Sequence, residues 1–302
     1  MSLGAAEAAI TVAEEQGGGL WREAVKRLSR NPAAIIGAVL IALFVFVAIF
    51  ADWLAPYTAM APDLSQIEGP GHVPGPSAEH WLGLDDNGRD LLSRIILGAR
   101  QSLLVGVVSL LFGMAGGIIL GLLAGGLGGW VDSTVMRLVD MMLAIPGLLF
   151  AIGIAAMLGQ GMTAVMIAIG VVNIPVFARL LRGQMLAQRE ADYALAAKSL
   201  GVKRSRIILG HVFPNSLTPV IVQGTLTLAT AIIEAAGLAF LGLSGEDPSI
   251  PEWGRMLAES QRHLANAPQL VIAPGVAIVL AALGFTLLGE ALREALDPKY
   301  RR

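Results

Sequence analysis

Residues that could carry acid–base, nucleophilic or metal chemistry are sparse in this chain. It has no cysteine, which excludes both thiolate chemistry and disulfides. Asp85, Asp86 and Asp90 form a small acidic group, but they lack the ligand spacing of a calcium-binding loop. The histidines are scattered along the chain without metal-ligand spacing. They are His72, His80, His211 and His263. We expect no catalytic site, no metal site and no cofactor in this chain.

Two acids and two amides lie inside long apolar segments, where polar groups are costly and are functional candidates by default. They are Asp140, Asn173, Gln223 and Glu234. We expect Asp140 to pair with Arg137 or Arg182. Glu234 either lines a polar pathway or accepts hydrogen bonds from a neighbouring helix. For both acids structural pairing is favoured, and direct contact with a substrate stays open as the alternative.

A glycine-rich run over residues 125–129 superficially resembles a phosphate-binding loop. No strand is expected before it, and the chain contains no Gly-Lys-Ser or Gly-Lys-Thr sequence to complete such a loop. We therefore interpret this run as a tight turn between two helices. The chain is not expected to bind ATP by itself.

The polar, basic stretch from 189 to 215 separates two apolar runs and cannot lie in hydrocarbon. Its spacing predicts a short helix, a bend at Gly201 with positive φ, and a second amphipathic helix that ends at Pro214. One face of the first helix is formed by residues at i, i+3, i+4 and i+7. They are Tyr193, Ala196, Ala197 and Leu200.

The same stretch resembles the EAA loop of the permeases of ABC importers. The resemblance rests on Ala196-Ala197, Gly201 three residues later, and the run 211–214 nine residues after that. The chain departs from the general pattern at Leu195, His211 and Phe213. These departures, with Tyr193 before them and Asn215 after them, are similar to the C-type permeases of dipeptide and oligopeptide transport.

Three further segments resemble the same family. They are LGLDDNGRDLLSR at 82–94, PEWGRML at 251–257 and EALREALDPK at 290–299. The resemblance therefore extends from about residue 22 to the end of the chain. It implies the fold of a type I ABC importer permease, with the loop at 185–215 docked on an ATPase subunit. Its implied coupling residues are Tyr193, Ala196, Ala197, Lys198, Leu200, Gly201 and Pro214.

The resemblance also implies the partners. These are a second, homologous permease subunit in a heterodimer, two ATPase subunits that bind ATP and Mg²⁺, and an extracytoplasmic solute-binding protein that delivers a peptide. Relatives in such systems also carry nickel complexes or other small solutes, so the substrate stays open. Nucleic acid is not expected as a partner.

The composition independently predicts a membrane protein. The chain is 55% hydrophobic and 15% charged, with a mean hydropathy of +0.69. Its apolar runs predict an all-α protein with six transmembrane helices. These run about 33–54, 103–124, 136–158, 162–181, 217–243 and 270–289. Glycines 113, 117 and 121 give the second span a bare face that another helix can approach closely.

The chain then divides into five parts. Residues 1–21 form a disordered cytoplasmic N-terminus, 22–55 a basic segment with the first span, and 56–102 an external loop with an amphipathic helix. Residues 103–290 form a five-helix permease core that includes the coupling loop, and 291–302 a cytoplasmic tail. Prolines 146, 175, 219 and 274 each fall in one of the last four spans and are expected to kink them.

Basic residues predict the orientation in a bacterial or archaeal plasma membrane. With six spans, 15 of the 21 lysines and arginines fall on the side of both termini and the 189–215 loop, which is then cytoplasmic. A channel or secondary transporter would instead favour an inverted repeat or a chain of acids at mid-membrane, and neither is seen. A membrane enzyme would need converging catalytic groups, which the scattered histidines do not provide.

Overall fold

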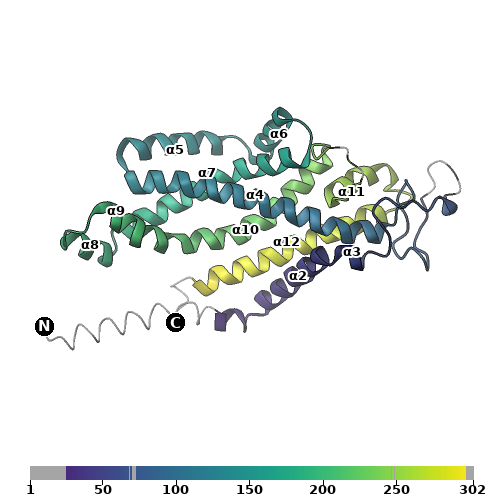
Figure 1. Ribbon diagram of the computed structural model, residues 1–302, viewed down its shortest axis with the longest axis horizontal. Coiled ribbons are helices and arrows are strands. Elements are labelled where there is room, and N and C mark those ends of the chain that lie inside the picture. The colour runs from purple at the N-terminus through teal and green to yellow at the C-terminus, as the bar shows by residue number, and fades with distance from the viewer. Residues whose placement is uncertain (1–24, 68, 70–72, 246, 248, 297–302) are drawn as a thin grey trace.

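Helices and loops make up the protein in the computed structural model, which describes residues 25–67, 69, 73–245, 247 and 249–296 (Figure 1). The predicted disordered segment 1–21 and the last six residues of the predicted tail lie outside the described residues. Within the described part there is no β-strand, and two isolated bridges, Pro62 to Arg89 and Leu84 to Asp90, are its only β-type pairings. The predicted all-α fold is confirmed.

Five long helices run along the long axis of the molecule (Figure 1). They are α2 (Pro32–Ile49), α4 (Leu91–Leu127), α7 (Met162–Arg189), α10 (Phe213–Phe240) and α12 (Gln269–Leu296). Each is long and apolar enough to cross a membrane. Side chains cap the first two of them. Asn31 accepts hydrogen bonds from the backbone N–H of Ala33 and Ala34, and Asp90 accepts one from Ser93.

The predicted span at 136–158 is not a straight helix. It is a bent pair, α5 (Gly129–Ala144) and α6 (Gly147–Leu158), whose axes differ by 95°. Pro146 stands between them. It lacks an N–H and disfavours helical geometry at the residue before it, so the first helix ends there. The described part therefore has six spans if this pair counts as one. Pro175, Pro219 and Pro274 lie inside helices that continue past them.

Two predicted breaks are wrong because the helices run on. The amphipathic helix expected before residue 103 is the first part of α4, which extends unbroken over 37 residues.

The second predicted break is at Pro214. There the short helix α9 (Arg204–Ile207) passes through a π-helical turn, Ile208–Val212, into α10. Pro214 does not end a helix. It lies at the start of α10, directly after the π-helical turn. Similarly, α12 continues to Leu296 in the predicted tail.

Small residues let α4 and α7 lie against each other along their length, as the sequence predicts. A Cβ added at Gly117 would come within 2.3 Å of the Cβ of Phe177 and 2.8 Å of the carbonyl oxygen of Ile174. Gly113 and Gly121 meet the backbone of α7 just as closely. The bare glycine face is therefore buried within this chain.

Short elements gather at the two ends of the bundle (Figure 1). One end carries α8 (Asp192–Ser199) and α9, and we call it the α8 end. The other carries α3 (Ala51–Leu54), α11 (Trp253–Ser260) and the 3₁₀ turns Leu64–Gln66 and Gln261–His263, and we call it the α11 end. The side chains proposed to act in function are distributed between these ends and the intervening helices.

Candidate functional site

The bend after α8 has the geometry that the sequence predicts. Gly201 has φ +78, in the left-handed region. The N–H of Val202 donates to the carbonyl of Ala197 at 3.1 Å, and the N–H of Gly201 donates to that of Lys198 at 3.0 Å. This is a Schellman motif, in which the last carbonyls of a helix are satisfied by a glycine turn. The predicted positive φ at Gly201 is confirmed.

The side chains of α8 divide into a buried and an exposed set. Ala194 is buried and Ala197 is half-buried, both in a cluster that also contains Ile207 and Met185 of α7. Leu200 is 84% exposed, and Leu195 and Tyr193 are 44% and 37% exposed. Ala196 is exposed as well, so three of the four residues on the predicted face point to solvent.

This exposed apolar surface stands outside the bundle, at the α8 end. Lys198, Lys203 and Arg206 lie exposed beside it. The Tyr193 hydroxyl donates to Gln188 Oε1 at 2.7 Å, which fixes the ring at the edge of the surface. Exposed large apolar side chains with a charged rim are typical of a protein interaction site. The arrangement can bind a protein partner and has no catalytic groups.

Two arginines tie this loop to the end of α4. Arg189 Nη1 donates to the carbonyl of Gly125 at 3.0 Å, and Arg204 Nη2 donates to those of Gly126 and Leu127 at 3.0 and 2.9 Å. The last carbonyls of a helix lack partners within the helix and carry partial negative charge, so they suit cationic donors. The glycine-rich run at 125–129 thus holds the 189–215 loop in place, a role that the sequence alone did not reveal.

The ion pairs beside this end correct one prediction. Asp140 pairs with Arg179, and both side chains are exposed. It pairs with neither Arg137 nor Arg182. The guanidinium of Arg182 instead binds Asp132, with Nη2 2.7 Å from Oδ2. Both pairs join α7 to α5 across the bundle surface.

The other three intramembrane candidates do not converge on one site. Asn173 is buried, and its Nδ2 donates to the carbonyl of Ile169 at 2.9 Å, within α7. Gln223 of α10 donates to Thr227 Oγ1 at 3.3 Å and lines a cavity of about 380 Å³. Glu234, further along α10, has a buried Oε2 without a hydrogen-bond partner in the described structure.

At the α11 end a buried ionic cluster joins residues distant in sequence. Arg89 Nε lies 2.6 Å from Asp85 Oδ2, and Nη2 atoms of Arg89 and Arg94 lie 3.2 and 3.3 Å from Glu259 Oε2. Both arginines are almost fully buried. Asp85 and Asp90 of the acidic group, for which no metal site was expected, therefore contribute ion pairs. Around it, Asp90 Oδ1 lies 2.9 Å from His80 Nδ1.

The segment at 251–257 packs directly on α4 beside this cluster. Trp253 is fully buried, and its indole Nε1 donates to the carbonyl of Ile95 at 3.0 Å. Glu252 caps α11 by accepting from the backbone N–H of Gly254 and Arg255, both at 2.9 Å. Burial raises the pKa of Glu252, against the opposing effect of these two hydrogen bonds.

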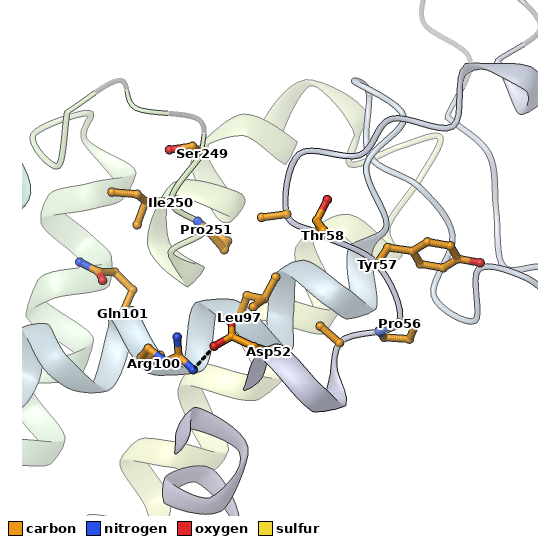
Figure 2. Close-up of a pocket in the computed structure, with 12 residues that line it drawn as sticks. Asp52, Pro56, Tyr57, Thr58, Leu97, Arg100, Gln101, Ser249, Ile250 and Pro251 are labelled. Carbon is orange, nitrogen blue, oxygen red and sulfur yellow. Dashed lines mark hydrogen bonds and ion pairs between the residues drawn. The ribbon is translucent and has the colours of Figure 1, made fainter. Parts of the chain in front are cut away.

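An open cavity of about 500 Å³ lies next to α3 at the same end (Figure 2). Arg100 and Asp52 meet on its floor, with Nη2 2.9 Å from Oδ2, while Ile250 and Pro251 approach from the loop before α11. Arg100 Nε also donates to the carbonyl of Ala48 at 3.0 Å. These contacts fix the end of α2 against α4, so the arginine has a structural role. Across the described residues, no three His, Cys, Asp or Glu side chains gather as a metal site.

Two known protein families match parts of the chain. Residues 117–302 match the family described as the binding-protein-dependent transport system inner membrane component. Residues 19–70 match the N-terminal transmembrane domain of oligopeptide transport permease C. The two matches together include the 185–215 loop, the last four spans and the first span.

Individual relatives resemble the chain over nearly its whole length. It is 46% identical to the dipeptide transport system permease protein DppC of Alkalihalophilus pseudofirmus, over 93% of this chain and 90% of that one. It is 42% identical to the glutathione transport system permease protein GsiD of Pectobacterium atrosepticum, over 93% and 92%. These relatives are permease proteins, so the chain is a transport component and not an enzyme.

A solved structure shares the fold. A chain of the MetNI methionine ABC transporter, in an inward facing conformation, superposes with a TM-score of 0.56 and 20% identity, covering 68% of this chain and 96% of that one. Fold, family matches and identity agree. The chain belongs to the family of binding-protein-dependent transport system inner membrane components, as a membrane permease with the fold of type I ABC importers.

Proposed function

We propose that the chain is one of two permease subunits of an ATP-driven importer that moves di- or oligopeptides into the cytoplasm. The substrate class is supported by the two relatives, which are a dipeptide permease and a permease for glutathione, itself a small peptide. A second homologous permease completes the pathway, two ATPase subunits bind ATP and Mg²⁺, and a solute-binding protein delivers the peptide.

The observation that carries the proposal is the surface at the α8 end. Leu195 and Leu200 project from a short helix whose position is fixed by a glycine turn and by hydrogen bonds from Arg189 and Arg204. A soluble subunit with an apolar groove can cover these side chains and so remove them from water. The coupling residues are Tyr193, Ala196, Ala197, Lys198, Leu200, Gly201 and Pro214, with Pro214 acting through the start of α10.

In this proposal the α8 end is cytoplasmic, together with both termini, and the α11 end faces outward. The basic residues near α8 and α9 support this orientation through the positive-inside rule. ATP binding closes the two ATPases against each other and displaces α8. Because arginines fix the loop to α4, the displacement reorients the long helices and opens the pathway outward. Hydrolysis then resets it.

The proposal is tested by reconstituting the four-subunit complex in liposomes with its binding protein. Uptake of radiolabelled dialanine and of glutathione is measured with and without ATP. We expect ATP-dependent uptake of at least one of them. ATP-dependent uptake of nickel, with neither peptide accumulating, would replace the peptide assignment. Uptake without ATPase subunits would overturn the importer assignment.

Orientation is tested separately in intact cells, because the chain has no cysteine of its own. Ser249 and Ser205 are exposed at opposite ends of the bundle. We expect a membrane-impermeant maleimide to label Ser249→Cys and to leave Ser205→Cys unlabelled until the cells are opened. The reverse pattern would invert the topology.

A further inference from the structure

One face of α10 differs from the surfaces around it. Most residues of this helix between Val220 and Ala239 are buried against the rest of the bundle. Beside the exposed Ile221 and Ile233, one line of side chains at i, i+3 and i+4 spacing is half-buried or exposed. They are Gln223, Leu226, Thr230, Glu234 and Gly237, and we call this set the α10 stripe.

The α10 stripe is polar where a lipid-facing surface would be apolar. On α12 the exposed residues at the same spacing between 272 and 283 are aliphatic, and they include Ile272, Val276 and Val279, each 49% exposed or more. That is the composition expected next to hydrocarbon. Three of the five α10 positions carry an amide, a hydroxyl or a carboxylate, and Gly237 leaves space beside them with no atom within 4 Å of an added Cβ.

Glu234 is the unusual member of this set. Its Oε2 is buried without a hydrogen-bond partner, and no ion pair with Glu234 occurs in the described structure. Every other buried or half-buried acid discussed above has a cationic or N–H partner. A carboxylate within a membrane helix is costly unless it faces water or meets a cation. No partner for Oε2 lies in the described part of this chain, and the side chain as a whole is half-buried, so part of it is open to a partner from outside.

The stripe leads from Glu234 toward the cavity of about 380 Å³ near the α8 end. Gln223 and Leu226 line that cavity, together with Gln184 of α7 and Arg293 at the end of α12. The α10 stripe therefore runs from an acid near the α11 end to a cavity that is lined by a cation. Such a stripe fits a solute that has its own ammonium group and several hydrogen-bonding groups.

We infer that the α10 stripe lines the translocation pathway and that Glu234 binds the ammonium group of the peptide during transport. This inference rests on the proposed function, in which the substrate is a peptide. A free α-amino group is common to dialanine and glutathione. Its three N–H donors form charge-assisted hydrogen bonds with a carboxylate, which supplies the partner that Glu234 lacks. Glu234 thus favours peptides with a free amino terminus over neutral solutes of the same size.

Access of water is tested with single cysteines in the reconstituted complex, whose other subunits are cysteine-free. Glu234→Cys and Thr230→Cys are treated with the cationic reagent MTSET, and Val279→Cys on the aliphatic face of α12 is the matched control. We expect the α10 positions to react at least ten times faster than Val279→Cys. Dialanine added with ATP and loaded binding protein should slow the reaction at position 234. Equal rates at the three positions would refute the pathway assignment.

The charge is tested by Glu234→Gln, which keeps the shape of the side chain, and by Glu234→Asp, which keeps the charge. Dialanine uptake by Glu234→Gln should have a kcat reduced about tenfold, with the KM set by the binding protein unchanged. Glu234→Asp should retain at least half of the wild-type kcat. Unchanged kcat in Glu234→Gln would refute the role in binding the ammonium group, as would equal losses in the two variants.

The two proposals fail differently. If the wild-type complex takes up neither dialanine nor glutathione, the peptide function fails, and with it the ammonium role. The MTSET rates still decide whether the α10 stripe lines an aqueous pathway. If wild-type uptake is normal but Glu234→Gln is unaffected, the peptide function stands and the inference about Glu234 fails.

Discussion

Gly201 offers the sharpest test of the docking role proposed for the 189–215 loop, because its substitution changes the backbone without creating a clash. Its φ of +78 is one that residues with a Cβ adopt at a cost of about 1–2 kcal/mol. No atom lies within 4 Å of an added Cβ, so steric overlap adds nothing to that cost. The whole penalty of Gly201→Ala falls on the turn that positions α8 and α9.

We expect this penalty to appear as weaker binding of the ATPase subunits. If the turn must keep its geometry in the complex, about 1–2 kcal/mol reduces the affinity roughly 5- to 30-fold. Asparagine enters the left-handed region more readily than alanine, so Gly201→Asn should lose less. Gly201→Asp has the same shape as Gly201→Asn plus a charge. A larger loss for the aspartate would place this position inside the docked surface.

The assay titrates the purified ATPase subunit onto the permease pair in nanodiscs and measures Kd, then measures peptide-stimulated ATP hydrolysis. Gly183→Ala is the matched control, because Gly183 also has open space around its Cβ position but lies within α7 at a helical φ. The control should bind the ATPase normally. If Gly201→Ala and Gly201→Asp also bind and couple at wild-type levels, the loop is not the docking element.

Further predictions concern the packing and the charges that hold the bundle. Gly117→Ala should lower the thermal unfolding midpoint in detergent, because its Cβ would overlap Phe177, with a cost of about 1–3 kcal/mol. Gly153 in α6 has open space around its Cβ position, so Gly153→Ala should leave the unfolding midpoint unchanged or raise it. Equal midpoints for Gly117→Ala and Gly153→Ala would contradict the close α4–α7 contact. Glu259→Ala removes one of the acids that pair with the buried guanidiniums of Arg89 and Arg94, so it should destabilise the α11 end. The expected loss is only on the order of 1 kcal/mol, because the Glu259 side chain is a third exposed and water screens the pair. Proteolysis of the α11 segment measures this loss, and exposed Glu294→Ala is the control. Glu252→Ala should remove the cap of α11 and cost about 1 kcal/mol of stability. Glu252→Gln should cost less, because burial already disfavours the charged form of the Glu252 carboxyl group. Hydrogen exchange at the backbone N–H of Gly254 and Arg255 distinguishes the two variants.

Local signals predicted much of the docking loop from the sequence. The turn at Gly201 depends on residues within five positions of it, and the apolar spacing in α8 and α9 is equally local. The apolar runs located the spans for the same reason. The proline predicted a kink at residue 146. The apolar runs did not show that this kink is a bend of 95°, because a hydropathy window measures only apolar length, and the apolar composition continues on both sides of the proline.

Contacts between distant segments could not be predicted in this way. Glu259 pairs with Arg94 and Arg89, which lie 165 and 170 positions earlier in the chain, and no local pattern specifies this pairing. Asp140 has three arginines within reach in principle. Which of them it meets depends on the rotation and offset of α7 against α5, and therefore on packing that only the folded structure defines.

The unbroken length of α4 has a mechanical consequence. A helix of 37 residues is about 55 Å long, so this single element spans the molecule from the ionic cluster to the glycine carbonyls that accept from Arg189 and Arg204. A rigid rod pivoting near one end converts a tilt of about 5° into a displacement of about 5 Å at its far tip. In the proposed function, small rotations caused by ATP binding at the α8 end would therefore also move the α11 end, because no loop interrupts the helix between them.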